Sequence, residues 1–458
     1  MSETKAAMTA DPHSGGTIHA ALKGFSNGGR RGDYVQSQLD RIADPSGEGS
    51  RAFLKVYGTA IATASTYDDL ARQGKTLPPY AGVTISIKDL FDVAGDVTTS
   101  GSALLKAAAP AARDAEAVAR LRSAGFIPVG RTNMTEFAFS GLGMNPHYGT
   151  PLNPYDRATG RIPGGSSSGA AVSVSDGMAT VALGTDTGGS CRIPAALCGL
   201  VGFKPTASRV PSEGTMPLST SLDSIGSIGR SVACCAIVDA VISGQPFTAS
   251  DVDLSSLTFG VPSSYVFDDI DRPTALAFER ALQRLSAAGV KIITTDTPQF
   301  HDIPMINAKG GLVAREAYLY HRSWIDRCGD AYDPRVLVRI LKGESQTDAD
   351  YRAVQRARRT LIDKAEIATR PFDALVMPTV PTIAPALGEL AQDDDYGRIN
   401  LLMLRNPTIA NMLDRCAISL PCHDGDEPPV GFMLMGKAME DHRLLNIAAR
   451  IEPVLRVM

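Results

Sequence analysis

The stretch from Gly164 to Pro205 constrains what this chain can fold into more than any other part of the sequence. It contains two segments rich in glycine and serine, 164–169 (GGSSSG) and 184–190 (GTDTGGS), with an apolar part between them. This pattern predicts two tight loops packed against one buried segment, because glycine lets a backbone approach its neighbours closely. A serine that ends a run of backbone N–H groups is what acyl transfer needs: a nucleophile beside donors for an oxyanion.

An upstream segment, 83–88 (VTISIK), alternates apolar and polar residues. A period of two predicts a strand, and it places the Lys88 amine on the polar face at the strand's end. Between the two glycine-rich segments, residues 170–174 predict a buried helix and residues 180–183 a short buried strand. The chain therefore offers a lysine at the end of a strand, upstream of two candidate serine loops.

The rest of the chain alternates helices and strands. We expect helices at 114–124, 274–288 and 351–369, and strands at 126–129, 257–261, 290–293 and 373–378. Alternation of this kind predicts an α/β architecture, with residues 243–256 as the best candidate linker. The last of these helices carries arginines that we expect to form a solvated face: Arg352, Arg356, Arg358 and Arg359.

Asn133 and Glu136 are three residues apart, which is the spacing of a helix N-cap and its capping-box partner. We therefore expect a helix to begin here, with Glu136 as a cap rather than a catalytic group.

The two loops and two upstream segments, 83–89 (VTISIKD) and 130–137 (GRTNMTEF), together resemble the amidase signature family of hydrolases. The resemblance is strongest over about residues 80–230. It implies a Ser-Ser-Lys triad whose positions fall on Lys88, Ser166 and Ser190. One residue departs from the family's pattern: Cys191 stands where an aliphatic side chain is usual, and a small buried cysteine can replace one.

The same resemblance implies an α/β fold built on a large mixed β-sheet that helices cover on both faces. We expect a flexible tail over residues 1–16 and a single domain over 17–458. Within that domain the signature core spans about 80–230, and a variable region at about 300–345 shapes the substrate site.

The resemblance also implies a mechanism. Neutral Lys88 takes a proton from Ser166, Ser166 takes one from Ser190, and Ser190 attacks the amide carbonyl to give an acyl-enzyme. The family holds the first-loop serine through a cis peptide, expected here at Gly165–Ser166. Four backbone N–H groups are the implied oxyanion donors: those of Thr187, Gly188, Gly189 and Ser190.

Asp186 and Arg192 flank the second loop. Their spacing suggests an ion pair. This pair either holds the shape of the second loop and so supports the site, or is a structural salt bridge with no role in the site.

Composition narrows the function classes. A formal net charge of −4 leaves no basic footprint for nucleic acid or an anionic membrane. The sequence contains no His or Cys spacing typical of a metal site, so we expect neither a metal nor a cofactor. The seven cysteines are scattered, and no long apolar segment is present. We therefore expect a cytoplasmic protein with reduced thiols.

The expected activity is hydrolysis of the C–N bond of a small aryl or alkyl amide, and carbamates and esters are possible alternative substrates. A homodimer is a possible oligomeric state. One alternative is the amidase subunit of a glutamyl-tRNA amidotransferase, which uses the same chemistry. Another is an α/β-hydrolase, because residues 165–169 match the G-x-S-x-G elbow with Ser167 as nucleophile. Residues 157–163 (RATGRIP) lack the strand that should precede an elbow.

Overall fold

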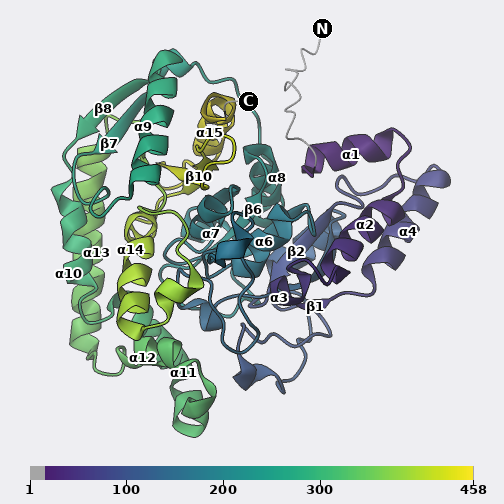
Figure 1. Ribbon diagram of the computed structural model, residues 1–458, viewed down its shortest axis with the longest axis horizontal. Coiled ribbons are helices and arrows are strands. Elements are labelled where there is room, and N and C mark those ends of the chain that lie inside the picture. The colour runs from purple at the N-terminus through teal and green to yellow at the C-terminus, as the bar shows by residue number, and fades with distance from the viewer. Residues whose placement is uncertain (1–15, 457–458) are drawn as a thin grey trace.

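The computed structural model describes residues 16–456, and its centre is one sheet of eleven strands (Figure 1). Their order across the sheet is β1–β3–β2–β4–β6–β5–β10–β11–β9–β7–β8. The strands are β1 (Phe53–Val56), β2 (Thr84–Lys88), β3 (Ile127–Thr132), β4 (Val181–Asp186), β5 (Val201–Lys204), β6 (Ser224–Gly229), β7 (Thr258–Pro262), β8 (Lys291–Thr295), β9 (Ala374–Pro378), β10 (Ala417–Pro421) and β11 (Gly431–Met435).

The sheet is mixed. β2 runs parallel to β3 and β4, and β7 runs parallel to β8 and β9, whereas the other neighbouring pairs are antiparallel. Because β2 and β4 are parallel neighbours, their carboxyl ends meet at the same edge of the sheet. This topology brings Lys88, at the end of β2, beside the loop that follows β4.

Helices cover both faces. One face packs on α6, α7, α13 and α14, and the other on α5, α8, α9 and α15. The α-helices are α1 (Ile18–Ser26), α2 (Arg31–Ala43), α3 (Gly49–Ala52), α4 (Ala60–Arg72), α5 (Glu116–Ser123), α6 (Ser168–Ser175), α7 (Arg192–Leu197), α8 (Val232–Ser243), α9 (Arg272–Ala287), α10 (Asp302–Ile306), α11 (Gly311–Cys328), α12 (Pro334–Leu341), α13 (Asp348–Thr369), α14 (Asp393–Met412) and α15 (Asp441–Leu455).

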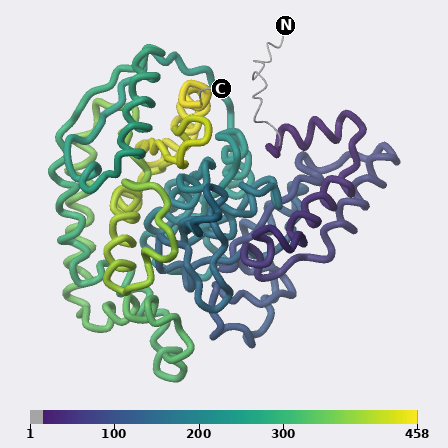
Figure 2. Tube along the Cα trace, in the orientation of Figure 1, coloured from purple at the N-terminus to yellow at the C-terminus, as the bar shows by residue number. Residues whose placement is uncertain are grey.

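The N-terminal helices α1, α2 and α4 lie at the β1 end of the molecule, and α9, α10 and α13 lie at the opposite end (Figure 2). The site-bearing strands β2 and β4 are the third and fourth strands of the sheet, counted from the β1 edge. None of the described helices is both long and apolar enough to cross a bilayer.

The predicted fold class is confirmed, and so are the helices and strands expected from periodicity, with ends that shift by a few residues. The helix expected at 114–124 is α5, and it ends before Gly125, whose φ of +98° suits a helix stop. The expected tail, 1–16, lies outside the described residues except for its last residue. The expected linker carries no α-helix or strand between α8 and β7.

The capping prediction at Asn133 is wrong. The segment that follows is a single 3₁₀ turn, Glu136–Ala138, and Asn133 donates instead to the backbone oxygens of Arg51 and Gly149. Glu136 is fully buried and accepts hydrogen bonds from Ser102 Oγ, His147 Nε2 and the Asp333 N–H. Its carboxylate therefore joins segments far apart in sequence, which local spacing cannot show.

Candidate active site

Lys88 lies at the end of β2 with its side chain completely buried. The apolar residues of β2 pack on the α5 and α8 side, so the alternation turns Lys88 toward α6. Its Nζ donates to Ser166 Oγ over 2.8 Å and to Thr185 Oγ1 over 2.9 Å. Within residues 16–456 no carboxylate lies at ion-pair distance from this ammonium. Burial therefore dominates and lowers the pKa of Lys88 to about 8, although the negative charges of Asp186 and Asp223 oppose that shift.

Ser166 precedes α6 on the first glycine-rich loop and is fully buried. The Gly165–Ser166 peptide is cis, as the family resemblance implies. The backbone is packed so closely here that a Cβ on Gly165 would lie 2.5 Å from the backbone N of Gly143. Only glycine fits at this position. The loop therefore places Ser166 Oγ directly beside the Lys88 amine.

Ser190 ends the second loop and retains a 3% exposed surface. Gly189 has a φ of +125°, and a Cβ there would lie 2.6 Å from Pro407 Cβ, so the turn before Ser190 requires glycine. Among the residues that the structure describes, Ser190 Oγ has no hydrogen-bond partner, Ser166 included. Its hydroxyl is thus free to meet a ligand.

The four expected oxyanion donors are not equivalent. The Gly189 N–H donates to Asp186 Oδ1 over 2.8 Å, so this expected donor already has an acceptor within the protein. The N–H groups of Thr187, Gly188 and Ser190 donate to no acceptor in the described part of the chain. Three unsatisfied donors on one loop beside a free serine hydroxyl form a ready site for negative charge.

The second loop is anchored from behind by a buried ion pair. Arg192 and Asp186 are both fully buried and lie 2.8 Å apart. Asp186 also accepts the N–H of Cys191, and Asn411 donates to Asp186 through its side-chain amide. Burial alone would raise the pKa of Asp186, but the charge of Arg192 and its hydrogen bonds outweigh burial and hold that pKa well below its usual range.

Known proteins resemble this chain over most of its length. The family model named Amidase matches residues 33–445. The chain belongs to the amidase family. A 2-amino-5-chloromuconic acid deaminase from Comamonas testosteroni is 38% identical over 86% of each chain. The amidotransferase relative, one subunit of the glutamyl-tRNA(Gln) amidotransferase from Symbiobacterium thermophilum, is 32% identical over 93% of each. A crystal structure of an amidase has a TM-score of 0.86 and 30% identity, and the match covers 95% of this chain and 99% of that one.

Membership of the amidase family makes the protein an enzyme that hydrolyses C–N bonds. This establishes the reaction class that the two serine loops indicated.

Two residues that sequence reasoning missed support the amidase site. Asn411, on α14, bridges Arg192 and the backbone oxygen of Asp186. Asp223, partly buried, accepts the hydroxyl of Thr187 over 2.6 Å, and loss of solvent around its carboxyl raises the pKa of Asp223 to about 6. No local pattern marks either residue, because each acts on a loop that lies 36 or more positions away.

The elbow interpretation of Ser167 is wrong. An elbow serine follows a strand and exposes its Oγ. Here residues 157–159 form a 3₁₀ turn, and no strand lies between it and Ser167. The Ser167 side chain is completely buried and reaches only the backbone oxygen of Thr185, at 3.5 Å.

The described residues contain no cluster of three or more His, Cys, Asp or Glu side chains that could hold a metal ion.

Proposed function

We propose that this amidase cleaves its substrate through a Ser-Ser-Lys triad formed by Lys88, Ser166 and Ser190. The observation that carries the proposal is the environment of Lys88: a fully buried amine, 2.8 Å from Ser166 Oγ, bonded to hydroxyls only. An amine held this way loses its proton near neutral pH, and a lysine must be neutral to act as a base.

The proposed reaction begins with Lys88 neutral. Ser190 Oγ attacks the substrate carbonyl while its proton moves to Ser166, and Ser166 passes its own proton to Lys88. Substrate binding must bring Ser190 Oγ within reach of Ser166, since no hydrogen bond joins the two in the free enzyme; catalytic contacts often tighten only in the complex. Collapse of the tetrahedral intermediate returns a proton along the same path to the leaving amine. Water then attacks the acyl-enzyme by the same relay and releases the acid.

Negative charge on the carbonyl oxygen is stabilised by the N–H groups of Thr187, Gly188 and Ser190. Asp186 holds the loop by binding the Gly189 N–H, and Asp223 holds Thr187 through its hydroxyl. One oxyanion donor contributes about 3–4 kcal/mol in the transition state. These contacts keep the donors in place before the charge develops.

We propose a small amide as the substrate, aryl or alkyl, with carbamates and esters as further candidates. The setting that we propose is the cytoplasm, without metal or cofactor. All seven cysteines are free thiols and six of them are buried, which suits a reducing compartment. The oligomeric alternatives are a monomer and a homodimer.

A second candidate rests on the similarity to the glutamyl-tRNA(Gln) amidotransferase relative. The name of that relative describes it as one subunit, and so assigns it to a larger assembly. Glutaminase activity together with co-purification of partner subunits would favour this role. Hydrolysis of simple amides by the isolated chain favours the self-contained amidase.

The proposed nucleophile is tested by covalent labelling. A fluorophosphonate should label Ser190 in the native enzyme, and Ser190→Ala should abolish both labelling and turnover. Ser167→Ala, one position beyond Ser166 on the first loop, is the matched control and should still be labelled at Ser190. Labelling at Ser167 in the native enzyme would refute the assignment.

A further inference from the structure

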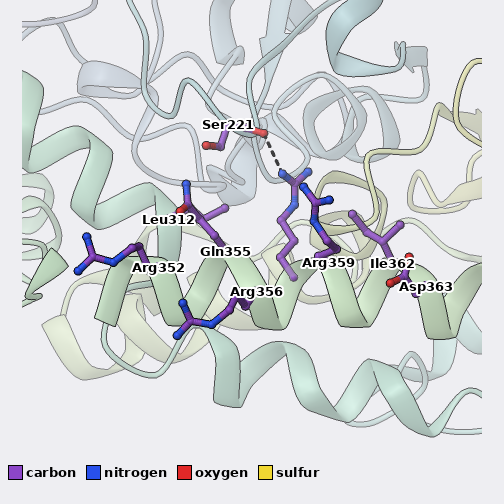
Figure 3. A pocket seen from close by; sticks show the side chains of 9 residues that line it. Ser221, Leu312, Arg352, Gln355, Arg356, Arg359, Ile362 and Asp363 are labelled. Atoms are coloured by element: carbon purple, nitrogen blue, oxygen red, sulfur yellow. Dashed lines mark hydrogen bonds between the residues drawn. The ribbon is translucent and has the colours of Figure 1, made fainter. Parts of the chain in front are cut away.

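The loop that leads into β6, residues 218–223 (LSTSLD), carries three hydroxyl residues between two buried leucines. Leu218 and Leu222 anchor its ends, because each packs in a hydrophobic cluster. The middle of the loop borders a cavity of about 640 Å³ along α13, and Ser221 is among the residues that line it (Figure 3). On that side polar contacts, rather than packing, hold the loop.

Glu316, on α11, accepts hydrogen bonds from all three hydroxyls. Ser219 Oγ lies 2.6 Å and Thr220 Oγ1 3.3 Å from Glu316 Oε2, and Ser221 Oγ donates to Oε1. The Ser221 N–H donates to Oε2 over 3.0 Å, and Tyr351 on α13 donates its hydroxyl to Oε1 over 2.7 Å. In the described part of the chain no cationic side chain lies at ion-pair distance from this carboxylate. Charge-assisted hydrogen bonds are about twice as strong as neutral ones, so Glu316 is a firm anchor for the loop.

Arg358 holds the same loop from the α13 side. Its guanidinium donates to the backbone oxygen of Ser221 over 3.3 Å (Figure 3). It also donates to the backbone oxygens of Asn411 and Met412, and these bonds correct the expectation that Arg358 belongs to a solvated face. The other arginines of that face are exposed, as expected: Arg352, Arg356 and Arg359. The loop is thus tied to α11 by a carboxylate and to α13 by a guanidinium.

The 218–223 loop reaches the oxyanion donors through its last residue. β4 and β6 pair antiparallel with Asp186 opposite Ser224, so Thr187 and Asp223 lie just beyond the pairing at the same end of the two strands. Asp223 Oδ1 accepts the Thr187 hydroxyl over 2.6 Å, while its Oδ2 accepts two N–H groups of the loop itself. The conformation of the loop therefore sets where this carboxylate points, and the carboxylate holds Thr187.

We infer that Glu316 is a positioning residue for the amidase reaction: it fixes the 218–223 loop, and through Asp223 it keeps Thr187 and the neighbouring oxyanion donors in place. This inference deepens the proposed function and rests on it. Donors stabilise a developing negative charge most when they are already in position before the reaction, which requires support from the residues behind them. Glu316 lies in the region expected to shape the substrate site, and this role connects that region to the oxyanion donors.

The first test replaces Glu316 with glutamine, which keeps the size of the side chain and removes its charge. Glu316→Gln should lower kcat for hexanamide about 10- to 100-fold and leave KM within about twofold, because misplacement by about 1 Å can cost roughly 100-fold and the contact acts on the transition state. Glu344→Gln is the matched control, since Glu344 accepts the hydroxyl of Tyr318, also on α11, over 3.1 Å. This control should leave kcat unchanged. A folded Glu316→Gln enzyme with native kcat would overturn the inference.

A double-mutant cycle with Thr187→Val tests whether Glu316 acts through this contact. Valine keeps the shape and the N–H of residue 187 but removes the hydroxyl that Asp223 binds. In the Thr187→Val background, Glu316→Gln should lower kcat by no more than about twofold further. Equal losses in both backgrounds would show a separate structural effect and count against the inference. If Glu316→Gln does not fold, Ser219→Ala combined with Ser221→Ala cuts the same bonds from the loop and replaces it in each comparison.

NMR of threonine methyl groups separates failure of this inference from failure of the proposed function. The Thr187 methyl signal, identified by its loss in Thr187→Val, should shift in Glu316→Gln and stay in place in Glu344→Gln. If the signal shifts in this way but native enzyme hydrolyses no amide, the proposed hydrolysis fails and the link from Glu316 to Thr187 stands. A Thr187 signal that ignores Glu316→Gln overturns the positioning role, whatever the activity.

Discussion

Replacing Lys88 with methionine should abolish amide hydrolysis and, near neutral pH, make the protein more stable. The proposed base must be neutral, so native kcat/KM should rise with pH and level off above a pKa of about 8. At pH 7 only ~10% of Lys88 is neutral at that pKa, and the rate should be about one tenth of its plateau. Lys88→Met should lose this dependence together with the activity.

The stability effect follows from the same pKa. Its fall from the usual 10.5 to about 8 means that keeping Lys88 charged inside the fold costs ~3 kcal/mol. Below pH 8 Lys88 is protonated in both the folded and the unfolded protein, so the folded protein bears this full free-energy cost. As pH rises through 8 the folded protein releases the proton first, so the cost shrinks between pH 8 and 10.5 and is then gone. Methionine removes the cost but also the bonds to Ser166 and Thr185, worth about 1 kcal/mol each.

The net expectation is that Lys88→Met is stabilised by ~1 kcal/mol at pH 7 and loses that advantage by pH 10. Urea unfolding of both proteins at pH 7, 8.5 and 10 measures the difference, and a neutral amide measures the rate without titrating itself. A native rate that does not change between pH 6 and 8 would refute the reasoning. So would a Lys88→Met protein that is less stable by the same amount at every pH.

Four further outcomes are expected. Ser166→Ala should lower kcat about 10²–10⁴-fold for an amide and less for a matched ester, whose alkoxide needs a proton less; near-native amide hydrolysis by the folded variant would exclude the relay. Asp223→Asn removes a charge that favours the Lys88 ammonium, so the acid limb of the rate profile should move to lower pH, and an unmoved limb counts against that coupling. Arg192→Met leaves Asp186 buried and unpaired, so urea unfolding should show a loss of about 3–5 kcal/mol, and unchanged stability would contradict the anchoring role. Dialysis against EDTA should leave activity intact; a loss that zinc restores would overturn metal independence.

Much of the fold could be predicted from the periodicity of apolar residues and from residue spacing. The alternation at 83–88 was enough to place a strand and to put Lys88 on its polar face, because a two-residue period has one structural meaning. The capping pattern at Asn133 failed for the opposite reason. Its residue types suit a helix start, but the fold uses Glu136 to join Ser102, His147 and the start of α12. Tertiary contacts decided the local structure there.

The sequence suggested the members of the site but not their surroundings. Resemblance supplied the triad positions, and spacing supplied the pair formed by Asp186 and Arg192. Asn411 and Asp223 carry no local signal, since their roles come from backbone and side-chain groups that only the folded sheet brings near. Arg358 shows the same limit within one helix: its neighbours are solvated, and it alone binds three carbonyl oxygens.

Lys88 and Arg131 show how the fold assigns different chemistry to two similar residues. Both are cationic, both are fully buried, and they lie on the adjacent strands β2 and β3. Arg131 lies at ion-pair distance from Asp89 and Asp96, and their charges outweigh burial and raise its pKa. Lys88 meets two hydroxyls instead, so burial prevails and its pKa falls. A cation held by carboxylates is a permanent structural charge, whereas one held by hydroxyls can give up its proton and serve as a base.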